Sequence, residues 1–387
     1  MSLTYDEILD TFNALKKTRT YLDEKWGEIK AFLKGKSRFV FVGCGSSYSI
    51  AKSFAAVCYM GAGKPATAIA AGDIILHAER YGKVIGGAAV VFISRSGRTS
   101  ELLMALDALK SQGCDFAVAS VVCAGGTPLG AKSDLVLATP WAFDESVCQT
   151  RCVTNFYFIA AYVSAKIASA SEMAYDMGAA CDPETAYSSG RACDMGAACD
   201  PETAYGAQLI GDLRQLLADG DAYTARARAL AEEISALPWT HAIVLADAEL
   251  EGLAEEGSLV FKEVCQLPSN YHHLLDVRHG PMVLAGEHTL VLAVVGGSNK
   301  LENDLLGDMK KKGAQVVAFC SGAATSGELG ELGEPGGVLL TGFGRPLPHI
   351  AAGIPFLILC QLIAYYKSRL TGADPDKPEG LDPWIAL

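Results

Sequence analysis

The sequence lacks the patterns that identify several common classes of binding site. It contains no C-x-x-C pair, so a zinc site built on paired cysteines is not expected. It has no G-x-x-x-x-G-K-[ST] loop, and the stretch Gly43–Tyr48 lacks the third glycine of G-x-G-x-x-G. These absences argue against nucleoside triphosphate and dinucleotide chemistry. We therefore expect neither a metal nor a cofactor.

Positive charge is also scarce, since the formal net charge of the chain is −12. Proteins that bind nucleic acid normally present a basic face to the phosphate backbone. The densest basic run is Lys310–Lys312, and Gly313 follows it. Cations followed by glycine are typical of a helix C-terminus, where they complement the dipole and the cap. We expect no nucleic-acid partner.

A clean membrane-spanning run is missing as well. The longest apolar stretch, Ile350–Tyr366, contains Gly353, Pro355 and Gln361, which favours a buried core helix. The first residues have no basic segment leading into an apolar one, so a signal peptide is not expected. Several of the 12 cysteines lie inside apolar runs, as reduced and buried cysteines do. The sequence therefore predicts a cytoplasmic protein with no membrane partner.

Short apolar runs rich in β-branched residues alternate with helical patterns in both halves of the chain. The predicted strands cover residues 38–42, 88–93, 116–123 and 135–138, then 241–246, 289–295, 316–319 and 338–340. Such alternation predicts a parallel sheet covered by helices on both faces. The segments Val90–Cys123 and Val291–Ser321 place strand, turn, helix and strand at matching intervals. We expect two copies of one α/β fold, each with its own core.

The expected domain boundaries follow from these patterns. A helical segment covers residues 1–34, the first domain 35–170, a linker 171–206, the second domain 207–370 and a C-terminal tail 371–387. Within the linker, the 12 residues DMGAACDPETAY occur at Asp176–Tyr187 and again at Asp194–Tyr205. This repeat is too short for a solenoid unit, and its Gly, Pro and Asp content is typical of a loop. We assign it no chemical role.

Two turns in the first half place glycine and hydroxyl groups at the start of a predicted helix. The first contains Gly45, Ser46 and Ser47, and the second spans Ser94–Thr99. The free N–H groups and the dipole at a helix N-terminus favour an anion. Serine and threonine at this position can instead cap the helix. Two such turns at the carboxyl ends of parallel strands favour a ligand-binding crevice.

A third group of residues could transfer protons. Glu256 and Glu263 lie two turns apart on one face of a predicted helix, and His279 follows before Gly280-Pro281. A carboxylate and an imidazole supply the general base and acid that move a proton between adjacent sugar carbons. The alternatives are a solvated helix carboxylate and a loop histidine.

Together these motifs resemble the sugar isomerase (SIS) domain family over most of the chain. Cys44–Ser47 and Ser94–Thr99 resemble its two phosphosugar turns, and Asp144–Thr150 resembles the loop that closes over the sugar. The stretch from Glu256 to Pro281 is similar to the catalytic stretch in the isomerase half of glucosamine-6-phosphate synthase. Gly372–Pro378 resembles that enzyme's C-terminal tail.

The resemblance implies two tandem SIS domains, each a flavodoxin-like parallel sheet sandwiched by helices. It implies that Glu263 is the base that shuttles a proton between C1 and C2 through an enediol. It also implies a homodimer, in which His279 assists ring opening in the partner subunit's site. The implied substrate contacts are Gly45, Ser46, Ser47, Ser94, Arg95, Ser96 and Thr99 for the phosphate, and Val147, Thr150 and Glu256 for the sugar.

Two departures from the synthase bear on the reaction. Val260 stands where the synthase has a helix lysine, and Gly380–Trp384 stands where its tail supplies the Schiff-base lysine. Without those amines, glutamine-dependent synthesis is not expected. Arg98 replaces a usual carboxylate or amide in the second phosphate turn, and its guanidinium could add a contact to phosphate.

The chain length and the Arg278–Pro281 motif are more similar to two other branches of the family. These are the amino-sugar-6-phosphate deaminase/isomerases and the deglycases that cleave fructose-6-phosphate–amino-acid adducts. We expect aldose–ketose isomerisation of a 6-phosphorylated (amino) sugar, with loss of an amine. The alternative is a non-catalytic phosphosugar-binding regulator, and the presence of both Glu263 and His279 favours the enzyme.

Overall fold

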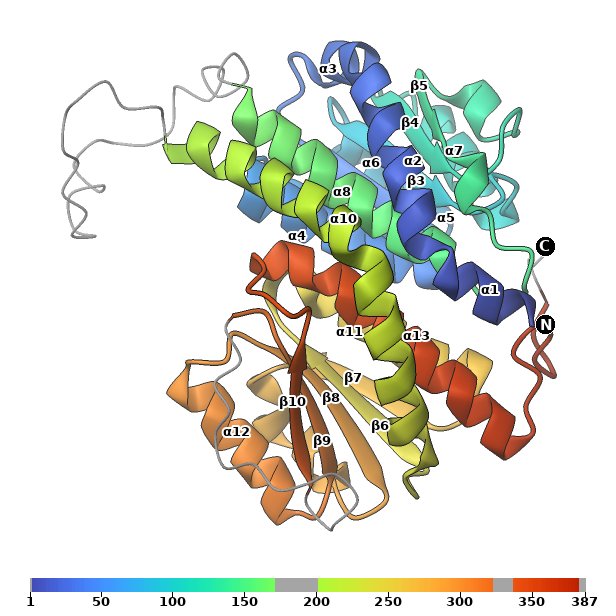
Figure 1. Cartoon of the computed structure of the whole chain (residues 1–387). Helices are drawn as coiled ribbons and strands as arrows, with labels where there is room; N and C mark the ends of the chain where they lie inside the picture. Colours follow the sequence, from blue (N-terminus) through green and yellow to red (C-terminus); the bar gives the residue numbers. More distant parts are fainter. Residues whose placement is uncertain (1, 171–200, 323–336, 383–387) are drawn as a thin grey trace, which may run out of the picture.

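The computed structural model describes residues 2–170, 201–322 and 337–382, which form two five-stranded parallel sheets with helices around them (Figure 1). The first sheet has the order β2-β1-β3-β4-β5, and the second has the order β10-β9-β8-β6-β7. Read from its other edge, the second order repeats the first. The predicted pair of α/β units is therefore confirmed. The strands are β1 (Phe39–Gly43), β2 (Ala66–Ala70), β3 (Ala89–Ser94), β4 (Ala117–Val122), β5 (Leu135–Ala138), β6 (His241–Ala246), β7 (Ser269–His273), β8 (Thr289–Val295), β9 (Gln315–Cys320) and β10 (Val338–Gly342).

Twelve helices accompany the strands in the described ranges. Those of the first half are α1 (Leu3–Leu9), α2 (Thr11–Glu24), α3 (Trp26–Leu33), α4 (Ser46–Ala62), α5 (Ala71–Leu76), α6 (Ala78–Ile85), α7 (Ser100–Ser111) and α8 (Arg151–Ser169). Those that follow are α10 (Pro201–Ala236), α11 (Glu251–Val264), α12 (Lys300–Lys311) and α13 (His349–Thr371).

The end of the predicted linker, residues 171–206, overlaps the start of a helix. Helix α10 begins at Pro201, so the last residues of the second copy of the repeat are helical. Proline is well suited to the first turn of a helix, because its missing N–H would have no partner there. The first copy, Asp176–Tyr187, and the start of the second lie outside the described residues.

The two halves share a central core, where we expected two separate ones. Alternate residues of each strand face opposite ways: Val91 and Ile93 of β3 join the central core, whereas Val90 and Phe92 join an outer cluster under α5–α7. Helices α4, α8, α10, α11 and α13 lie between the two sheets (Figure 1). Since α8 and α13 are apolar on nearly all sides, they pack against both halves at once.

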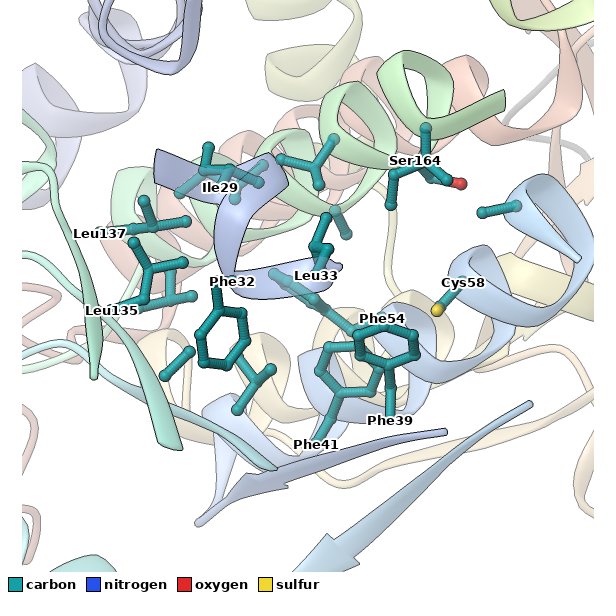
Figure 2. Close-up of a pocket in the computed structure, with 18 residues that line it drawn as sticks. Ile29, Phe32, Leu33, Phe39, Phe41, Phe54, Cys58, Leu135, Leu137 and Ser164 are labelled. Atoms are coloured by element: carbon teal, nitrogen blue, oxygen red, sulfur yellow. The ribbon is translucent and has the colours of Figure 1, made fainter. Parts of the chain in front are cut away.

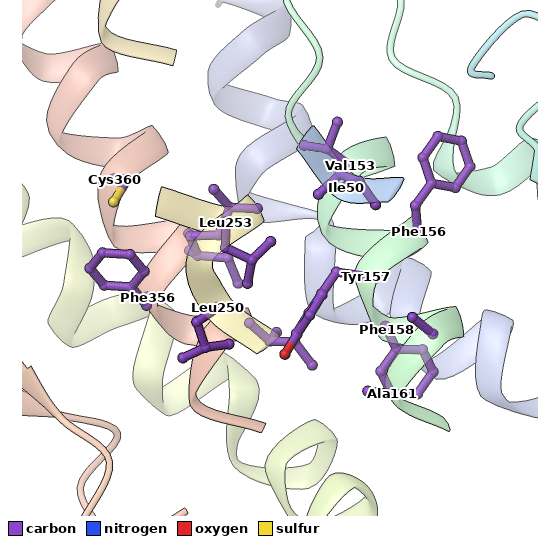
Figure 3. Packing of buried hydrophobic residues seen from close by; sticks show 14 of the residues in the cluster. Ile50, Val153, Phe156, Tyr157, Phe158, Ala161, Leu250, Leu253, Phe356 and Cys360 are labelled. Carbon is purple, nitrogen blue, oxygen red and sulfur yellow. The ribbon is translucent and has the colours of Figure 1, made fainter. Parts of the chain in front are cut away.

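The contact between α8 and α13 shows how the halves are joined. Tyr157 is fully buried, and its hydroxyl donates to the carbonyl oxygen of Ile350 at 2.7 Å. Leu250 and Leu253 of the second half lie beside it, and Phe356 belongs to the same cluster on their far side (Figure 3). Helix α13 is long and apolar enough to cross a membrane, but 89% of its most apolar window is buried inside the protein. The predicted core helix is therefore confirmed.

An apolar cavity of about 80 Å³ lies on the inner face of the first sheet, beneath α3 (Figure 2). Phenylalanine, leucine, isoleucine and valine side chains form most of its wall. The one hydroxyl in the lining, that of Ser164, is already bonded to the Val57 carbonyl oxygen at 3.1 Å. A cavity with this lining offers no partner to a phosphate, so the candidate site has to be sought elsewhere.

Helices α4 and α11 approach each other closely because Gly252 has no side chain. A Cβ atom at this position would lie 2.2 Å from the Ser49 carbonyl oxygen, which is far inside van der Waals contact. The two helices belong to different halves, so this approach sets the distance between the first turn of α4 and the acidic face of α11.

We predict that Gly252→Ala forces the helices apart and lowers the free energy of unfolding by about 1–3 kcal/mol. The matched control is Gly211→Ala in α10, where a Cβ meets nothing within 4 Å and the higher helix propensity of alanine should stabilise the chain by up to about 1 kcal/mol. Urea denaturation followed by circular dichroism measures both effects. Equal stability of Gly252→Ala and the parent would contradict this account of the packing.

Candidate functional site

The first turn, between β1 and α4, can be built only with glycine at two positions. A Cβ on Gly43 would lie 2.3 Å from the Ser47 carbonyl oxygen, and Gly45 has φ +52° and ψ −130°, a conformation that residues with side chains avoid. The chain then enters α4 with Ser46 and Ser47 buried, each only 4% exposed. The turn therefore brings backbone and hydroxyl groups to the carboxyl end of β1, as predicted from the sequence.

The second turn, between β3 and α7, draws its hydroxyl groups together. Ser94 Oγ accepts a hydrogen bond from Gly97 N at 3.0 Å and lies 3.0 Å from Thr99 Oγ1. Ser96 Oγ accepts from Arg98 N at 3.2 Å. Thr99 is the N-cap residue of α7 but makes no capping hydrogen bond with its side chain. The capping alternative does not account for Thr99, which favours the anion-binding interpretation of this turn.

The Arg95 side chain contacts the segment that follows β5, and its predicted contact with a phosphate stays a prediction. Its guanidinium donates to the carbonyl oxygens of Ser146 at 2.8 Å and Val147 at 3.2 Å, and it lies over the ring of Phe143. The side chain is only 6% exposed. In this structure, the hydrogen bonds of Arg95 link the second turn to the segment that follows β5. Arg98, by contrast, is exposed.

The segment of residues 143–150, called the site loop below, leads into α8. Asp144 Oδ2 accepts hydrogen bonds from the backbone N–H of Thr150 at 2.8 Å and of Cys152 at 3.0 Å, so it caps that helix. Val147 is half-buried. Thr150 is fully buried, and within the described residues its hydroxyl oxygen has no hydrogen-bond partner. An unpartnered buried hydroxyl is consistent with the predicted contact to a sugar.

Helix α11 presents the two predicted carboxylates to this loop. Glu256 is 1% exposed; burial and the charge of Glu263 raise its pKa well above the ordinary value, and the nearby Ser46 hydroxyl opposes them. Burial raises the pKa of Glu263 to about 7, although the charges of Arg95 and Lys262 lower it. A carboxyl group with a pKa near neutrality can exchange a proton at physiological pH.

Cys148 marks the point where the loop meets α11. Its pKa is raised, first by burial and then by the carboxylates of Glu263 and Glu256, with the guanidinium of Arg95 acting in the opposite direction. The thiol thus lies within the electrostatic reach of all three groups. The two turns, the site loop and α11 therefore converge on one region, which we call the polar cluster.

The sequence analysis missed a cationic group beside this cluster. Lys52 of α4 pairs with Glu255 of α11 at 2.7 Å, and its ammonium lies 4.9 Å from the ring centre of Tyr48 and 5.6 Å from that of Tyr271. No local sequence pattern predicts this arrangement, because the residues that form it come from α4, α11 and β7. A second amine, Lys262, lies on α11. Its Nζ donates to Ser258 Oγ at 2.9 Å, and burial lowers its pKa.

His279 is not part of the polar cluster in the described chain. It ends a 3-10 turn, Asp276–His279, and is exposed, while the neighbouring Arg278 pairs with Asp308 at 2.6 Å. Among the described residues it makes no hydrogen bond or ion pair with Glu263. The contribution of His279 to a partner subunit's site stays a prediction.

In the second half, a carboxylate of the protein occupies the turn that corresponds to the second hydroxyl turn. After β8, the carboxylate of Glu302 accepts hydrogen bonds from Gly296 N at 3.0 Å and from Gly297 N at 3.2 Å. The strand order makes this turn the counterpart of the one after β3. Its backbone donors are already satisfied by a carboxylate of the protein, which directs an external anion to the first half.

Comparisons with known proteins agree with this geometry. The family model of the SIS domain matches residues 32–155. Residues 32–155 form an SIS domain. This SIS domain contains both hydroxyl turns and the site loop, while α11 and its carboxylates lie beyond it in the chain.

One of two relatives extends the likeness to most of the chain. D-galactosamine-6-phosphate deaminase from Shewanella sp. (strain ANA-3) is 28% identical over 146 residues, or 36% of this chain and 34% of that protein. Glutamine–fructose-6-phosphate aminotransferase from Pseudomonas putida is 26% identical over 374 residues, or 93% of this chain and 53% of that protein. The chain thus spans about a third and about half of these two relatives.

A solved structure supports the tandem arrangement. The C-terminal domain of glucosamine-fructose-6-phosphate aminotransferase from Francisella tularensis has a TM-score of 0.75 over 98% of both chains, at 19% identity. The likeness shows that the described residues of both halves share this fold. The predicted architecture, two tandem SIS-type α/β units, is confirmed.

If the second turn of the SIS domain binds phosphate, Ser96→Ala and Thr99→Val should each weaken it. Removing one hydrogen bond to a charged ligand costs about 1.5–3 kcal/mol, so we expect about a tenfold or greater loss of affinity for fructose 6-phosphate. Ser111→Ala, at the exposed far end of α7, is the control. Isothermal titration calorimetry measures the three constants, and unchanged affinity in both turn variants would remove the assignment.

Proposed function

We propose that this protein is a phosphosugar isomerase that acts on a 6-phosphorylated (amino) sugar and releases an amine in the process. In this proposal, the phosphate binds at the two hydroxyl turns and the sugar chain extends towards α11. Glu263 removes the proton from C2 of the open-chain aldose and returns it to C1 through an enediol. Where C2 carries an amine, the intermediate is the corresponding enamine and the product is the C2 imine. Water adds to this imine, the C–N bond breaks, and the amine leaves as the C2 ketone forms. Ser96, Thr99 and the backbone of the turns hold the phosphate while the proton moves.

The observation that carries this proposal is the state of Glu263. Burial raises its pKa to about 7, whereas an exposed helix carboxylate would stay fully ionised and weakly basic. Glu256 lies on the same helix face, and burial followed by the charge of Glu263 raises its pKa, which favours the protonated form that can donate a hydrogen bond to a sugar oxygen. A regulator that only binds a phosphosugar needs the hydroxyl turns but has no use for a base poised near neutrality.

The names of two relatives and the position of Val260 support the proposed substrate class. The deaminase relative is named for an amino-sugar 6-phosphate and the aminotransferase relative for fructose 6-phosphate, so hexose 6-phosphates and their amino derivatives are the first compounds to test. The synthase reaction is disfavoured because Val260 is a buried apolar residue, 1% exposed, where an amine would be needed. We place the reaction in the cytoplasm, where such sugars are metabolised.

Glu263→Gln should preserve shape and binding but remove the base. Turnover should fall by about two to four powers of ten, with substrate affinity largely kept. Because the ionised form is the active one, kcat/KM of the parent should fall as the pH drops below about 7 and level off above it. Exchange of the C2 proton with deuterated water measures both effects. Full activity in Glu263→Gln, or a flat profile between pH 5 and 8, would refute the role of this residue.

His279 can be tested by complementation. If it acts in the partner subunit of a homodimer, then Glu263→Gln and His279→Ala subunits are each inactive alone. A mixed dimer should regain activity, because one of its two sites holds both native groups. Differently tagged subunits, purified together, give the heterodimer. An inactive heterodimer, or a chain that is monomeric by sedimentation, would rule out a site shared between subunits.

A further inference from the structure

The site loop has no regular secondary structure of its own, yet it carries residues that the proposed reaction needs in fixed places. Val147 and Thr150 are the expected sugar contacts, and Cys148 lies within the electrostatic reach of Glu256 and Glu263. A loop of this kind keeps one conformation only if neighbouring elements satisfy its backbone groups. Its hydrogen bonds therefore show what positions it.

Glu7 of α1 satisfies the donors at the centre of the loop. Its Oε1 accepts from the backbone N–H of Glu145 at 2.6 Å and of Ser146 at 3.2 Å, and its Oε2 accepts from Ser146 Oγ at 2.5 Å. The side chain is 6% exposed, and its helix is separated from the loop by more than 130 residues of sequence. Both carboxylate oxygens are thus used to hold a distant segment.

Helix α1 is itself held by the C-terminal tail. Asp376 Oδ1 accepts from Thr4 N at 2.8 Å and from Ser2 Oγ at 2.7 Å, while its Oδ2 accepts from Leu3 N at 3.0 Å. Two of these donors, Leu3 N and Thr4 N, are free backbone N–H groups of the first turn of α1, so Asp376 acts as a cap from the other end of the chain. The carbonyl oxygen of Asp376 also accepts from Val147 N at 3.1 Å. The tail, α1 and the site loop form a closed set of contacts.

We propose that Glu7 is a positioning residue for sugar binding, and that α1, capped by Asp376, fixes the site loop over α11. This inference rests on the proposed function, since it assigns the loop to a sugar. It adds residues that lie outside the segment matched by the SIS family model.

The electrostatics indicate that Glu7 works by hydrogen-bond geometry. Burial and the neighbouring carboxylate of Asp144 raise its pKa, whereas the hydrogen bonds from Ser146 and Glu145 lower it. Burial and the Asp144 carboxylate both disfavour a charge on Glu7, so its contribution lies in the three loop donors that its oxygens accept. An uncharged group of the same shape should serve equally well.

Glutamine is such a group. In Glu7→Gln, the amide oxygen can accept from the two backbone N–H groups, and the amide NH₂ can donate to Ser146 Oγ. With the amide donating, the Ser146 hydroxyl proton can go to the carbonyl oxygen of Cys148, which lies at 2.9 Å. Glu7→Ala removes all of these contacts. Asp6→Ala, at the exposed neighbouring position on the same helix, is the matched control.

The test compares two ligands on the full chain. Inorganic phosphate reports the hydroxyl turns alone, and fructose 6-phosphate reports the turns together with the loop. In Glu7→Ala we expect the Kd for fructose 6-phosphate to rise about tenfold or more, since the three hydrogen bonds that hold the loop are lost together, while that for phosphate stays within about twofold. Glu7→Gln and Asp6→Ala should both behave as the parent. Equal weakening of both ligands, or damage in Glu7→Gln as large as in Glu7→Ala, would overturn the proposal.

A second readout needs no ligand. Hydrogen exchange of the Glu145 and Ser146 amides should be about tenfold faster in Glu7→Ala than in the parent, while amides of β3 keep their protection. Unchanged loop exchange would overturn the proposal. If the parent binds phosphate but no hexose 6-phosphate, the proposed function fails, and the exchange result still decides on Glu7. Should Glu7→Ala not fold, Asp376→Ala must reproduce the selective loss of loop protection.

Discussion

Helix α11 meets α4 at Gly252, where the Ser49 carbonyl of α4 leaves no room for a side chain. This contact joins the two halves of the chain, and it determines the chemistry of the polar cluster. It places the first turn of α4, with Ser46, against Glu256, which lies one turn further along α11. Glu256 is thereby removed from water and its pKa rises. Two turns later, Glu263 lies near the site loop and Arg95. Burial raises its pKa to about 7, although the positive charges of Arg95 and Lys262 lower it.

Much of this fold could be predicted from local sequence, and the exceptions have a common cause. Strands β5, β6 and β8 were predicted to the residue, because each is a compact run of aliphatic residues. Strands β2 and β7 were not predicted. Their sequences, ATAIA and SNYHH, have little strand propensity of their own. Both lie at a sheet edge, where pairing with β1 or β6 imposes the extended conformation.

Some residues of the polar cluster could likewise be predicted from local sequence, and others could not. Helical periodicity placed Glu256 and Glu263 on one face, and the glycine and hydroxyl pattern located both turns. Neither the direction of Arg95 nor the contacts of Glu7 could be inferred, because each depends on a segment that only the tertiary fold brings near. For Glu7 there was a weak signal: it lies among Thr4, Ile8 and Thr11 on the buried face of the first helices. A carboxylate on a buried helix face requires donors, even when the sequence does not name them.

The two halves share one strand order but differ in what ends their strands. After β3 the chain offers hydroxyl groups, whereas after β8 it offers Glu302, which occupies the backbone donors itself. At the end of β6, the counterpart of β1, Asp247 pairs with His349 at 3.1 Å. The second half thus neutralises its own strand ends and supplies carboxylates through α11. In the proposed reaction, the first half supplies the residues that bind the phosphate, and the second half supplies the base. The distance between them is then a property of the shared core, and neither half could set it alone.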